Sequence, residues 1–319
     1  MSFQEKRVLV TGSAGFLGRN LVNRLVTELA YIIGADLNDS GSTEAKQLKV
    51  DILHPSERLK ECVANSDIIF HLAGYSSAHM FTAFEPGFSS NVQSLLRILE
   101  YAAQSGERKR VVFPSSSTVY TASAYPSKED SVASTPVNWY AASKLTGELL
   151  CKHYAQHETL DAVVLRIFCG YGPHEQHKGI YASPPTLFIT EMMNGNAPVL
   201  WGDGRQERDF IYVDDVVDAL LLAATQPVQG DVFNVGTGVS TSFIDLVNTV
   251  NEILGTDSEP IFSSPGLSSY LQKTMADPTK ATKGLGFRSR TGLREGLKRT
   301  IAFLESAQGR KETLPTASF

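Results

Sequence analysis

The sequence contains few cysteines and no basic cluster. Its three cysteines, Cys62, Cys151 and Cys169, lie far apart in 319 residues. An odd and dispersed set does not make a disulfide framework and favours a reducing compartment. The formal net charge is -5 and no run of lysine and arginine stands out, so we do not expect a nucleic-acid-binding surface.

Long apolar runs are also missing. No segment stays apolar over the length that a membrane-spanning helix needs, so we expect no membrane contact. The polar lead from Ser2 to Lys6 runs into an expected strand and lacks the features of a secretory signal. We therefore expect a cytoplasmic protein. Its 42% hydrophobic content is sufficient for one large core or two ordinary ones.

A glycine-rich turn follows the first expected strand, residues 7–10, and precedes an expected helix, residues 19–27. In the segment TGSAGFLG, Gly12 suits a tight turn, Gly15 the close approach of a pyrophosphate, and Gly18 the packing of helix on strand. The helix would offer its N-terminal N–H groups to the phosphates. This pattern predicts dinucleotide binding.

An acidic residue, Asp36, ends the second expected strand, residues 31–35. A carboxylate at about this distance from the glycines accepts hydrogen bonds from the adenosine ribose and repels a 2′-phosphate, so NAD is preferred over NADP. A later apolar strand contains His71, which we interpret as a buried core histidine rather than a catalytic one.

Tyr140 and Lys144 are four residues apart at the start of an expected helix, residues 140–157. Residues i and i+4 share one face of a helix, so the ammonium of Lys144 is expected close to the phenol of Tyr140. A nearby cation favours the phenolate and lowers its pKa, so the pair is a candidate general acid or base. Many surface helices show the same spacing.

Hydroxyl groups crowd the end of another expected strand, Arg110 to Phe113, which we expect to break at Pro114. Ser115, Ser116, Ser117 and Thr118 follow. Open α/β sheets bind ligands at the carboxyl ends of their strands. The alternative interpretation is a polar turn.

Strands and helices alternate up to about residue 172, which predicts an α/β fold with a doubly wound parallel sheet, Rossmann-like, and a smaller, intertwined α/β substrate domain. We expect residues 1–172 to form the NAD-binding domain and to receive about 211–238. Residues 173–210 and 239–307 would form the substrate domain, and 308–319 a flexible tail.

The ordered series TGSAGFLG, HLAG, SSSTVY, YAASK, LRIFCGYGP, GDGRQERDFIYVDD and FNVGTG resembles the extended short-chain dehydrogenase/reductases, specifically the NAD-dependent nucleotide-sugar epimerases and dehydratases. The resemblance covers roughly residues 7 to 305. It implies NAD as cofactor, a nucleotide sugar as substrate, and a homodimer formed through the helices around 89–104 and 140–157.

The resemblance also implies residue roles. Tyr140 corresponds to the catalytic base, Lys144 to its electrostatic partner, and Ser116 to the catalytic hydroxyl. The other cofactor-binding positions are Gly12, Gly15, Phe16, Leu17, Gly18, Asp36, Asp51, Ile52, Leu72, Ala73, Gly74 and Asn91. Substrate-binding positions, besides Ser116 and Tyr140, are Ser76, Ser117, Cys169, Arg208 and Tyr270.

Family dehydratases carry an acidic pair after the catalytic hydroxyl, whereas this chain has Ser117 and Thr118. The resemblance therefore implies a 4-epimerase acting through a 4-keto sugar, with a UDP sugar as the expected substrate. The alternatives are a 4,6-dehydratase or 4-ketoreductase and, more remotely, a non-catalytic NAD-sensing protein.

Two departures from the family concern substrate binding. Cys169 replaces a common asparagine, and a thiol is a poor hydrogen-bond donor. The family's second pyrophosphate arginine is missing, and either Lys273 or the group His174, His177 and Lys178 is a candidate replacement. His153 and His157 lack a clear third ligand, so we expect no metal site.

Overall fold

The computed structural model describes residues 3–38, 44–76, 80, 83–120, 125–132, 135–157, 160–264 and 271–306. Its centre is a seven-stranded sheet with the order β11-β6-β5-β4-β1-β2-β3, and every pairing in it is parallel. The strands are β1 (Arg7–Thr11), β2 (Tyr31–Asp36), β3 (Lys46–Lys49), β4 (Ile68–His71), β5 (Lys109–Ser116), β6 (Leu160–Ile167) and β11 (Val232–Val235). This is the predicted fold class.

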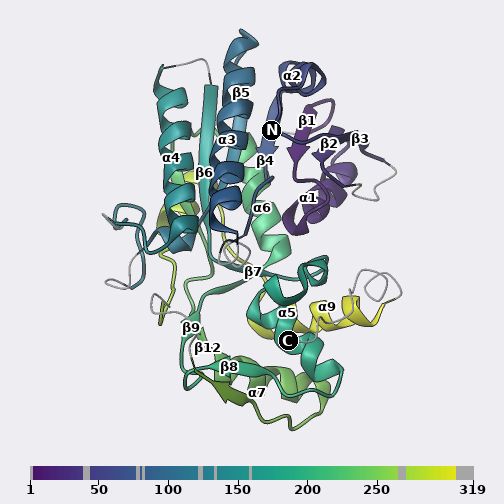
Figure 1. Ribbon diagram of the computed structural model, residues 1–319, viewed down its shortest axis with the longest axis vertical. Helices are drawn as coiled ribbons and strands as arrows, with labels where there is room; N and C mark the ends of the chain where they lie inside the picture. Colours follow the sequence, from purple (N-terminus) through teal and green to yellow (C-terminus); the bar gives the residue numbers. More distant parts are fainter. Residues whose placement is uncertain are drawn as a thin grey trace.

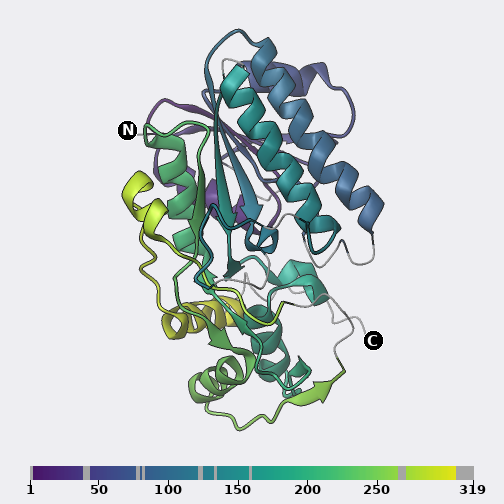
Figure 2. The same ribbon diagram turned by 90° about the vertical axis from the view of Figure 1, so that its left-hand side faces the viewer.

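Helices cover both faces of this sheet (Figure 1). One face carries α1 (Phe16–Thr27), α6 (Val213–Thr225) and α8 (Thr279–Leu285), and the other carries α2 (Glu57–Ala64), α3 (Phe84–Gln104) and α4 (Trp139–His157). Alternate residues of a strand pack into the cores on the two faces of the sheet. Phe70 packs against the helices of the first face and Ile69 against those of the second. Figure 2 shows α3 and α4 side by side across their face.

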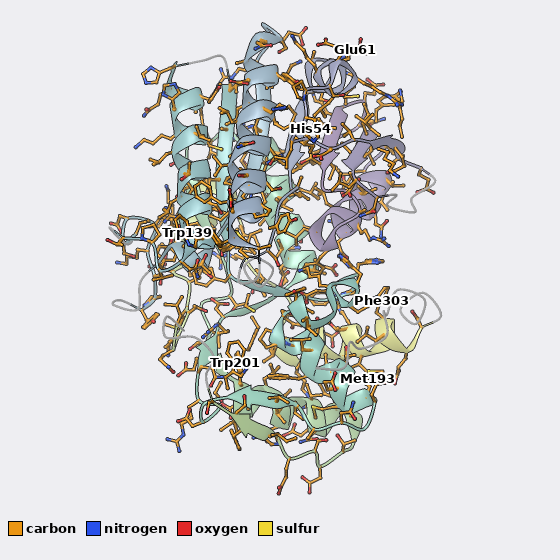
Figure 3. All side chains as sticks on the ribbon, in the orientation of Figure 1. His54, Glu61, Trp139, Met193, Trp201 and Phe303 are labelled. Atoms are coloured by element: carbon orange, nitrogen blue, oxygen red, sulfur yellow. The ribbon has the colours of Figure 1, made fainter. Side chains whose placement is uncertain are left out.

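A smaller part lies below the sheet in Figure 1 and contains α5 (Pro184–Met193), α7 (Phe243–Leu254) and α9 (Leu293–Glu305). Short strands pair within it or link it to the sheet: β7 (Cys169–Tyr171) with β10 (Phe210–Tyr212), β9 (Glu207–Arg208) with β12 (Thr241–Ser242), and β8 (Val199–Trp201) with β13 (Ile261–Ser263). Its core includes Phe188, Leu246 and Leu297. Figure 3 labels Met193, Trp201 and Phe303 in this part. None of the helices among the described residues combines the length and apolar character that crossing a membrane requires.

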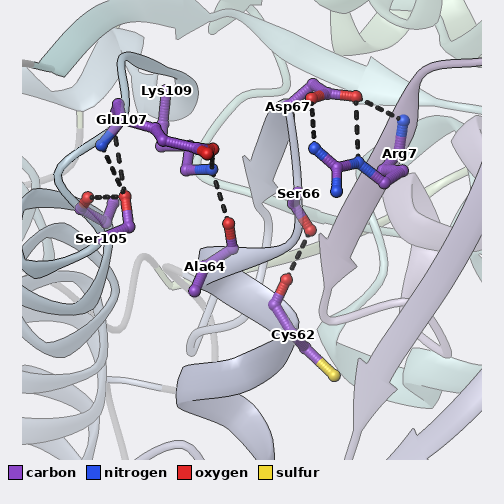
Figure 4. Close-up of polar contacts among 9 residues, drawn as sticks. Arg7, Cys62, Ala64, Ser66, Asp67, Ser105, Glu107 and Lys109 are labelled. Atoms are coloured by element: carbon purple, nitrogen blue, oxygen red, sulfur yellow. Dashed lines mark hydrogen bonds and ion pairs between the residues drawn. The ribbon is translucent and has the colours of Figure 1, made fainter.

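Hydrogen bonds and ion pairs of charged side chains stabilise the amino ends of the strands (Figure 4). The guanidinium of Arg7 donates to Asp67 at 2.9 Å, and this hydrogen bond holds the pKa of the Asp67 carboxyl below its usual value. Lys109 is buried, and its ammonium donates to the carbonyl of Ala64 at 2.6 Å and to Glu107 at 2.7 Å. The charged side chains at the amino edge of the sheet are therefore paired with one another. The candidate site lies at the opposite, carboxyl edge.

Several predicted boundaries were wrong. Strand β5 does not break at Pro114 but continues to Ser116, with Pro114 opposite Leu165 of β6. The ladder between β4 and β5 ends at Val112, so the missing N–H of the proline interrupts no bond of that ladder. Helix α1 begins at Phe16 and α3 at Phe84, both earlier than predicted.

Candidate functional site

The glycine-rich turn lies at the carboxyl edge of the sheet, between β1 and α1. Gly12 has a φ of +70°, and a Cβ there would lie 2.6 Å from the backbone nitrogen of Ala73. A Cβ on Gly18 would lie 2.0 Å from the carbonyl oxygen of Gly12. Both positions therefore exclude any side chain, for the reasons of turn geometry and helix packing that the sequence suggested.

The first turn of α1 is open to an anion. Gly15 is the N-cap residue and supplies no side-chain cap, and the first turn, which begins with Phe16 and Leu17, has no acidic residue. The N-terminal N–H groups of a helix need partners and carry the positive end of its dipole. The turn therefore suits a pyrophosphate.

Two carboxylates flank this turn along the strand ends. Asp36 accepts the Ala14 N–H at 3.0 Å and the Asn38 N–H at 2.9 Å, which fixes its carboxylate beside the glycines. Asp51 accepts the Leu53 N–H at 2.9 Å and lies next to the buried Ile52. This is the edge at which an adenosine would lie if the pyrophosphate occupied the α1 terminus.

The segment after β4 closes over the glycine turn. The N–H groups of Leu72 and Ala73 donate to the backbone carbonyl and the hydroxyl of Thr11, at 3.1 and 3.3 Å. A Cβ on Gly74 would lie 2.5 Å from Oδ1 of Asn91, which accepts the Tyr75 N–H at 2.7 Å. Asn91 also donates to the hydroxyl of Ser143 at 3.1 Å, so it joins this segment to α4.

His71 is a core histidine, as the sequence indicated. It is 1% exposed, and its ring nitrogens lie 2.9 Å from the hydroxyl of Thr11 and 3.1 Å from that of Ser94. Burial, with a smaller contribution from the positive charge of Lys144, lowers the pKa of His71 to about 3. The ring is therefore neutral at physiological pH.

Tyr140, Lys144 and Ser116 come together at the ends of α4 and β5. Ser116 lies close enough to the hydroxyl of Tyr140 to exert a lowering effect on the pKa of the phenol. The ammonium of Lys144 donates to the carbonyl of Pro114 at 2.9 Å and lies 5.7 Å from the centre of the Tyr140 ring. Trp139, labelled in Figure 3, lies at the lower end of α4, where its ring packs against Phe84 and Phe88 of α3. The structure thus assembles a phenol, a hydroxyl and a cation beside the glycine turn.

The pKa of Tyr140 differs from the sequence-based expectation. Although its side chain is only half-buried, protein atoms crowd the phenol, and this desolvation raises the pKa to about 12 against the lowering effect of Ser116. Burial also lowers the pKa of Lys144 to about 8. The prediction that Lys144 lowers the pKa of Tyr140 was wrong. The ammonium of Lys144 is directed at the Pro114 carbonyl and lies 4.8 Å from the Phe113 ring centre.

A buried ion pair supports this arrangement from behind. Arg166 donates to both carboxylate oxygens of Glu148, at 2.9 and 2.7 Å, and Glu148 accepts the hydroxyl of Ser115 at 2.5 Å. Arg166 also donates to the hydroxyl of Tyr120 at 2.9 Å. The pair joins α4, β5 and β6 one helical turn beyond Lys144, at the strand residue that precedes Ser116.

The candidate substrate residues lie toward the smaller part. Arg208 in β9 donates to the carbonyl of Glu207 at 2.7 Å, and its guanidinium lies 5.7 Å from the Phe243 ring centre. Next to it, the buried Asp209 accepts the N–H groups of Thr237, Gly238 and Ala276, which fixes the strand position. Cys169 follows β6, and burial raises the pKa of its thiol to about 12, so it is not an activated nucleophile.

Two other candidate substrate positions are described and one is not. The backbone carbonyl of Ser76 accepts the Met80 N–H at 3.2 Å. Ser117 lines a cavity of about 10 Å³ with Tyr125, Lys273 and other residues. Tyr270 lies outside the described residues. A larger cavity of about 330 Å³ lies between α4, β6 and β11, and its lining includes Glu148 and Arg166 but not Ser116, Tyr140 or Lys144.

The structure separates the candidate replacements for the missing arginine. The ammonium of Lys273 lies 2.8 Å from Glu207, beside Arg208, and both cations lower the otherwise desolvation-raised pKa of Tyr125. His174 is instead buried against Phe303, and Lys178 faces Phe16 of α1. Tyr125 was not predicted, and a tyrosine before a proline in a polar loop carries no signal that could have revealed it.

Residues 8–236 match the NAD dependent epimerase/dehydratase family. The chain belongs to this family. It is 34% identical to the UDP-glucose 4-epimerase of Mycolicibacterium smegmatis over 94% of this chain and 99% of that protein.

Solved structures of similar proteins agree with this membership. The UDP-glucose 4-epimerase of Thermotoga maritima with UDP-glucose superposes with a TM-score of 0.86 at 30% identity, covering 93% of this chain and 98% of that one. MoeE5 in complex with UDP-glucose and NAD gives 0.84 at 32% identity, covering 93% and 97%. The open α1 terminus, the close-packed glycines and Asp36 fit the family's cofactor, NAD.

Proposed function

We propose that this chain is an NAD-dependent epimerase that inverts C4 of a nucleotide sugar, with UDP as the nucleotide. The observation that carries the proposal is that Ser116, at the end of β5, meets Tyr140 and Lys144 of α4 beside the glycine turn that suits NAD, with the ammonium of Lys144 5.7 Å from the centre of the Tyr140 ring. Relatives from the same family with 4-epimerase names support it.

In this proposal Tyr140 is the catalytic base and Ser116 positions the sugar. As its phenolate, which the positive charge of Lys144 favours, Tyr140 accepts the proton of O4 while Ser116 hydrogen-bonds the same oxygen, and a 4-keto sugar forms as hydride leaves C4. NAD, when bound, supplies the hydride acceptor and later the donor. After the ketone turns over, Tyr140 returns its proton to O4 and C4 is inverted. Lys144 holds positive charge near the phenol as this proton leaves.

The residues after Ser116 favour epimerisation over dehydration. Thr118 donates its N–H and its hydroxyl to the Ser116 oxygen, at 3.2 and 3.1 Å, and Ser117 faces Tyr125 and Lys273. Neither Ser117 nor Thr118 is an acid that could assist the departure of a sugar hydroxyl. We therefore assign oxidation and reduction at C4 without loss of water.

For substrate binding we propose that Arg208 and Lys273 hold the pyrophosphate of the nucleotide sugar, with Cys169, Ser76 and Ser117 lining the sugar side. The NAD domain comprises residues 1–172 with 211–238, which is supported by the pairing of β11 with β6. Residues 173–210 and 239–307 form the substrate domain, although α8 packs on the main sheet. The tail 308–319 lies outside the described residues.

We also propose a cytoplasmic homodimer joined through α3 and α4. Phe84, Trp139 and Leu149 lie on these helices and expose 52%, 57% and 67% of their surface. Exposed apolar surface of this kind favours association. The free thiols of Cys62, Cys151 and Cys169 support a reducing compartment.

Proton NMR of the purified chain with a panel of UDP and dTDP sugars, without added NAD, tests the function. A C4 epimer should appear, and Tyr140→Phe should lose roughly a thousandfold in kcat while still binding NAD. A 4-keto-6-deoxy product would establish a dehydratase instead. Full turnover in Tyr140→Phe would rule out the assigned base.

A further inference from the structure

A lysine from the segment after β7 reaches the cofactor-binding helix. Lys178 lies in the short 3₁₀ segment Gln176–Tyr181, and its ammonium lies 4.5 Å from the centre of the Phe16 ring. Phe16 is the first residue of α1 and belongs to the turn whose N–H groups point toward the expected pyrophosphate. Lys178 therefore lies over the side chain of the first residue of a helix for which the sequence predicted only backbone donors to the phosphates.

The position of this segment over α1 is fixed independently. The amide of Asn20, on the second turn of α1, donates to the carbonyl of Pro173 at 2.9 Å and to that of Phe16 at 2.9 Å. The side chain of Lys178 is largely covered, with 20% of its surface exposed. The lysine is consequently held against the turn and is not a mobile surface group.

Glu175, the acidic neighbour of Lys178, accepts one hydrogen bond from its ammonium. Glu175 is buried, and its carboxylate accepts Ser183 N–H at 3.1 Å, the hydroxyls of Ser183 and Thr186 at 2.6 Å each, and Lys178 at 3.1 Å. An ammonium has three donors, and Glu175 is its one hydrogen-bond acceptor within the described part of the chain. The other two donors are available to a ligand anion.

We propose that Lys178 is a cofactor-binding residue that contacts the pyrophosphate of NAD at the N-terminus of α1. A cation in this partly water-excluded position adds a charge-assisted hydrogen bond to the backbone N–H contacts of the turn. It helps to retain the dinucleotide, which an epimerase needs because the same cofactor accepts and returns the hydride. The inference rests on NAD binding by the family and holds whichever sugar is the substrate.

The test is a fluorescence titration of the full-length chain, freed of bound NAD with charcoal, with NADH at low and high NaCl. Lys178→Met, which keeps the apolar stem over Phe16, should raise the Kd for NADH about tenfold, the effect of one charged hydrogen bond, and should weaken its salt dependence. Lys178→Arg should restore most of the affinity. ADP-ribose, which has the pyrophosphate but no nicotinamide, should lose the same factor.

The matched control is Lys280→Met. Lys280 also lies over a phenylalanine, 5.0 Å from the Phe233 ring centre, and pairs with an acid, Asp231, at 2.9 Å, but it is on α8. It should leave the Kd for NADH unchanged. Three results would overturn the proposal: an unchanged Kd in Lys178→Met with a lower unfolding temperature, a loss confined to NADH and absent for ADP-ribose, or a higher KM for the sugar with unchanged NADH binding. The first two are binding measurements, so they do not depend on which reaction the enzyme catalyses.

Discussion

The two halves of the candidate site are built differently. The cofactor half consists mainly of backbone groups held by glycines, with Gly12 and Gly18 in contact with neighbouring main chain. The proposed substrate half consists of charged side chains, chiefly Arg208 on the short strand β9 and Lys273, which pairs with the neighbouring Glu207. A backbone site tolerates almost no substitution, whereas a cation can be supplied from several places in a fold.

This difference explains which departures from the family pattern occur. The glycine turn, Asp36 and the Tyr140–Lys144 pair all match the pattern. The substrate half has Cys169 in place of asparagine and lacks the second arginine. The structure puts Lys273 beside Arg208 through its ion pair with Glu207, and we propose that Lys273 supplies the charge of the absent arginine.

The largest expected effect is in the cofactor half. Gly18→Ala places a methyl group 2.0 Å from the Gly12 carbonyl and 2.7 Å from the Ser13 Cα, and neither backbone atom can move away cheaply. We expect the Kd for NADH to rise about hundredfold, or roughly 3 kcal/mol, or the chain not to fold. Gly292→Ala, where no atom lies within 4 Å of the new Cβ, should bind NADH normally. A wild-type Kd for NADH in Gly18→Ala would contradict the conclusion that closely packed backbone groups form the cofactor half.

In the substrate half, Arg208→Met should raise KM about thirtyfold, near 2 kcal/mol, with kcat nearly unchanged, because the lost contact binds ground state and transition state alike. Steady-state kinetics on the nucleotide sugar measures both constants. Arg205→Met is the control, since Arg205 lies three residues before Arg208 but pairs with Asp203 in solvent. A large fall in kcat with unchanged KM would place Arg208 in the chemical step.

His71 gives the cofactor half a pH-dependent stability. Its pKa is about 3 in the folded chain and near 6.5 when unfolded, so the unfolded state binds more protons between these values. Its contribution is complete above pH 6.5 and falls by about 1.4 kcal/mol per pH unit as the pH drops toward 3. Thermal unfolding across this range should show a shallower slope for His71→Gln. The exposed His54→Gln should keep the wild-type slope, and equal slopes in all three proteins would refute the assignment.

The smallest effect is expected for Lys273. Because Glu207 already pairs with its ammonium at 2.8 Å and a third of each side chain is exposed, Lys273→Met should raise KM only about fivefold, near 1 kcal/mol. Lys273→Arg should retain the wild-type KM. If Lys273→Met matched Arg208→Met in its effect on KM, the two halves would differ less than their construction suggests.

The sequence alone determined the fold class and most of the cofactor half. Alternating strands and helices define a parallel sheet. Glycines are required where a side chain would collide with main chain, so the roles of Gly12 and Gly18 could be predicted from the sequence alone. His71 was likewise identified as a core residue from its apolar strand. These features depend on local sequence and on the periodicity of burial.

The tertiary structure decided what depends on distant segments. It brought Lys273 beside Arg208 and Lys178 against Phe16, across 65 and 162 positions of the sequence respectively. It also decided the pKa of Tyr140, since desolvation by surrounding atoms outweighs the local i, i+4 spacing of Lys144. Electrostatic contacts and desolvation act through space, so sequence spacing does not specify them.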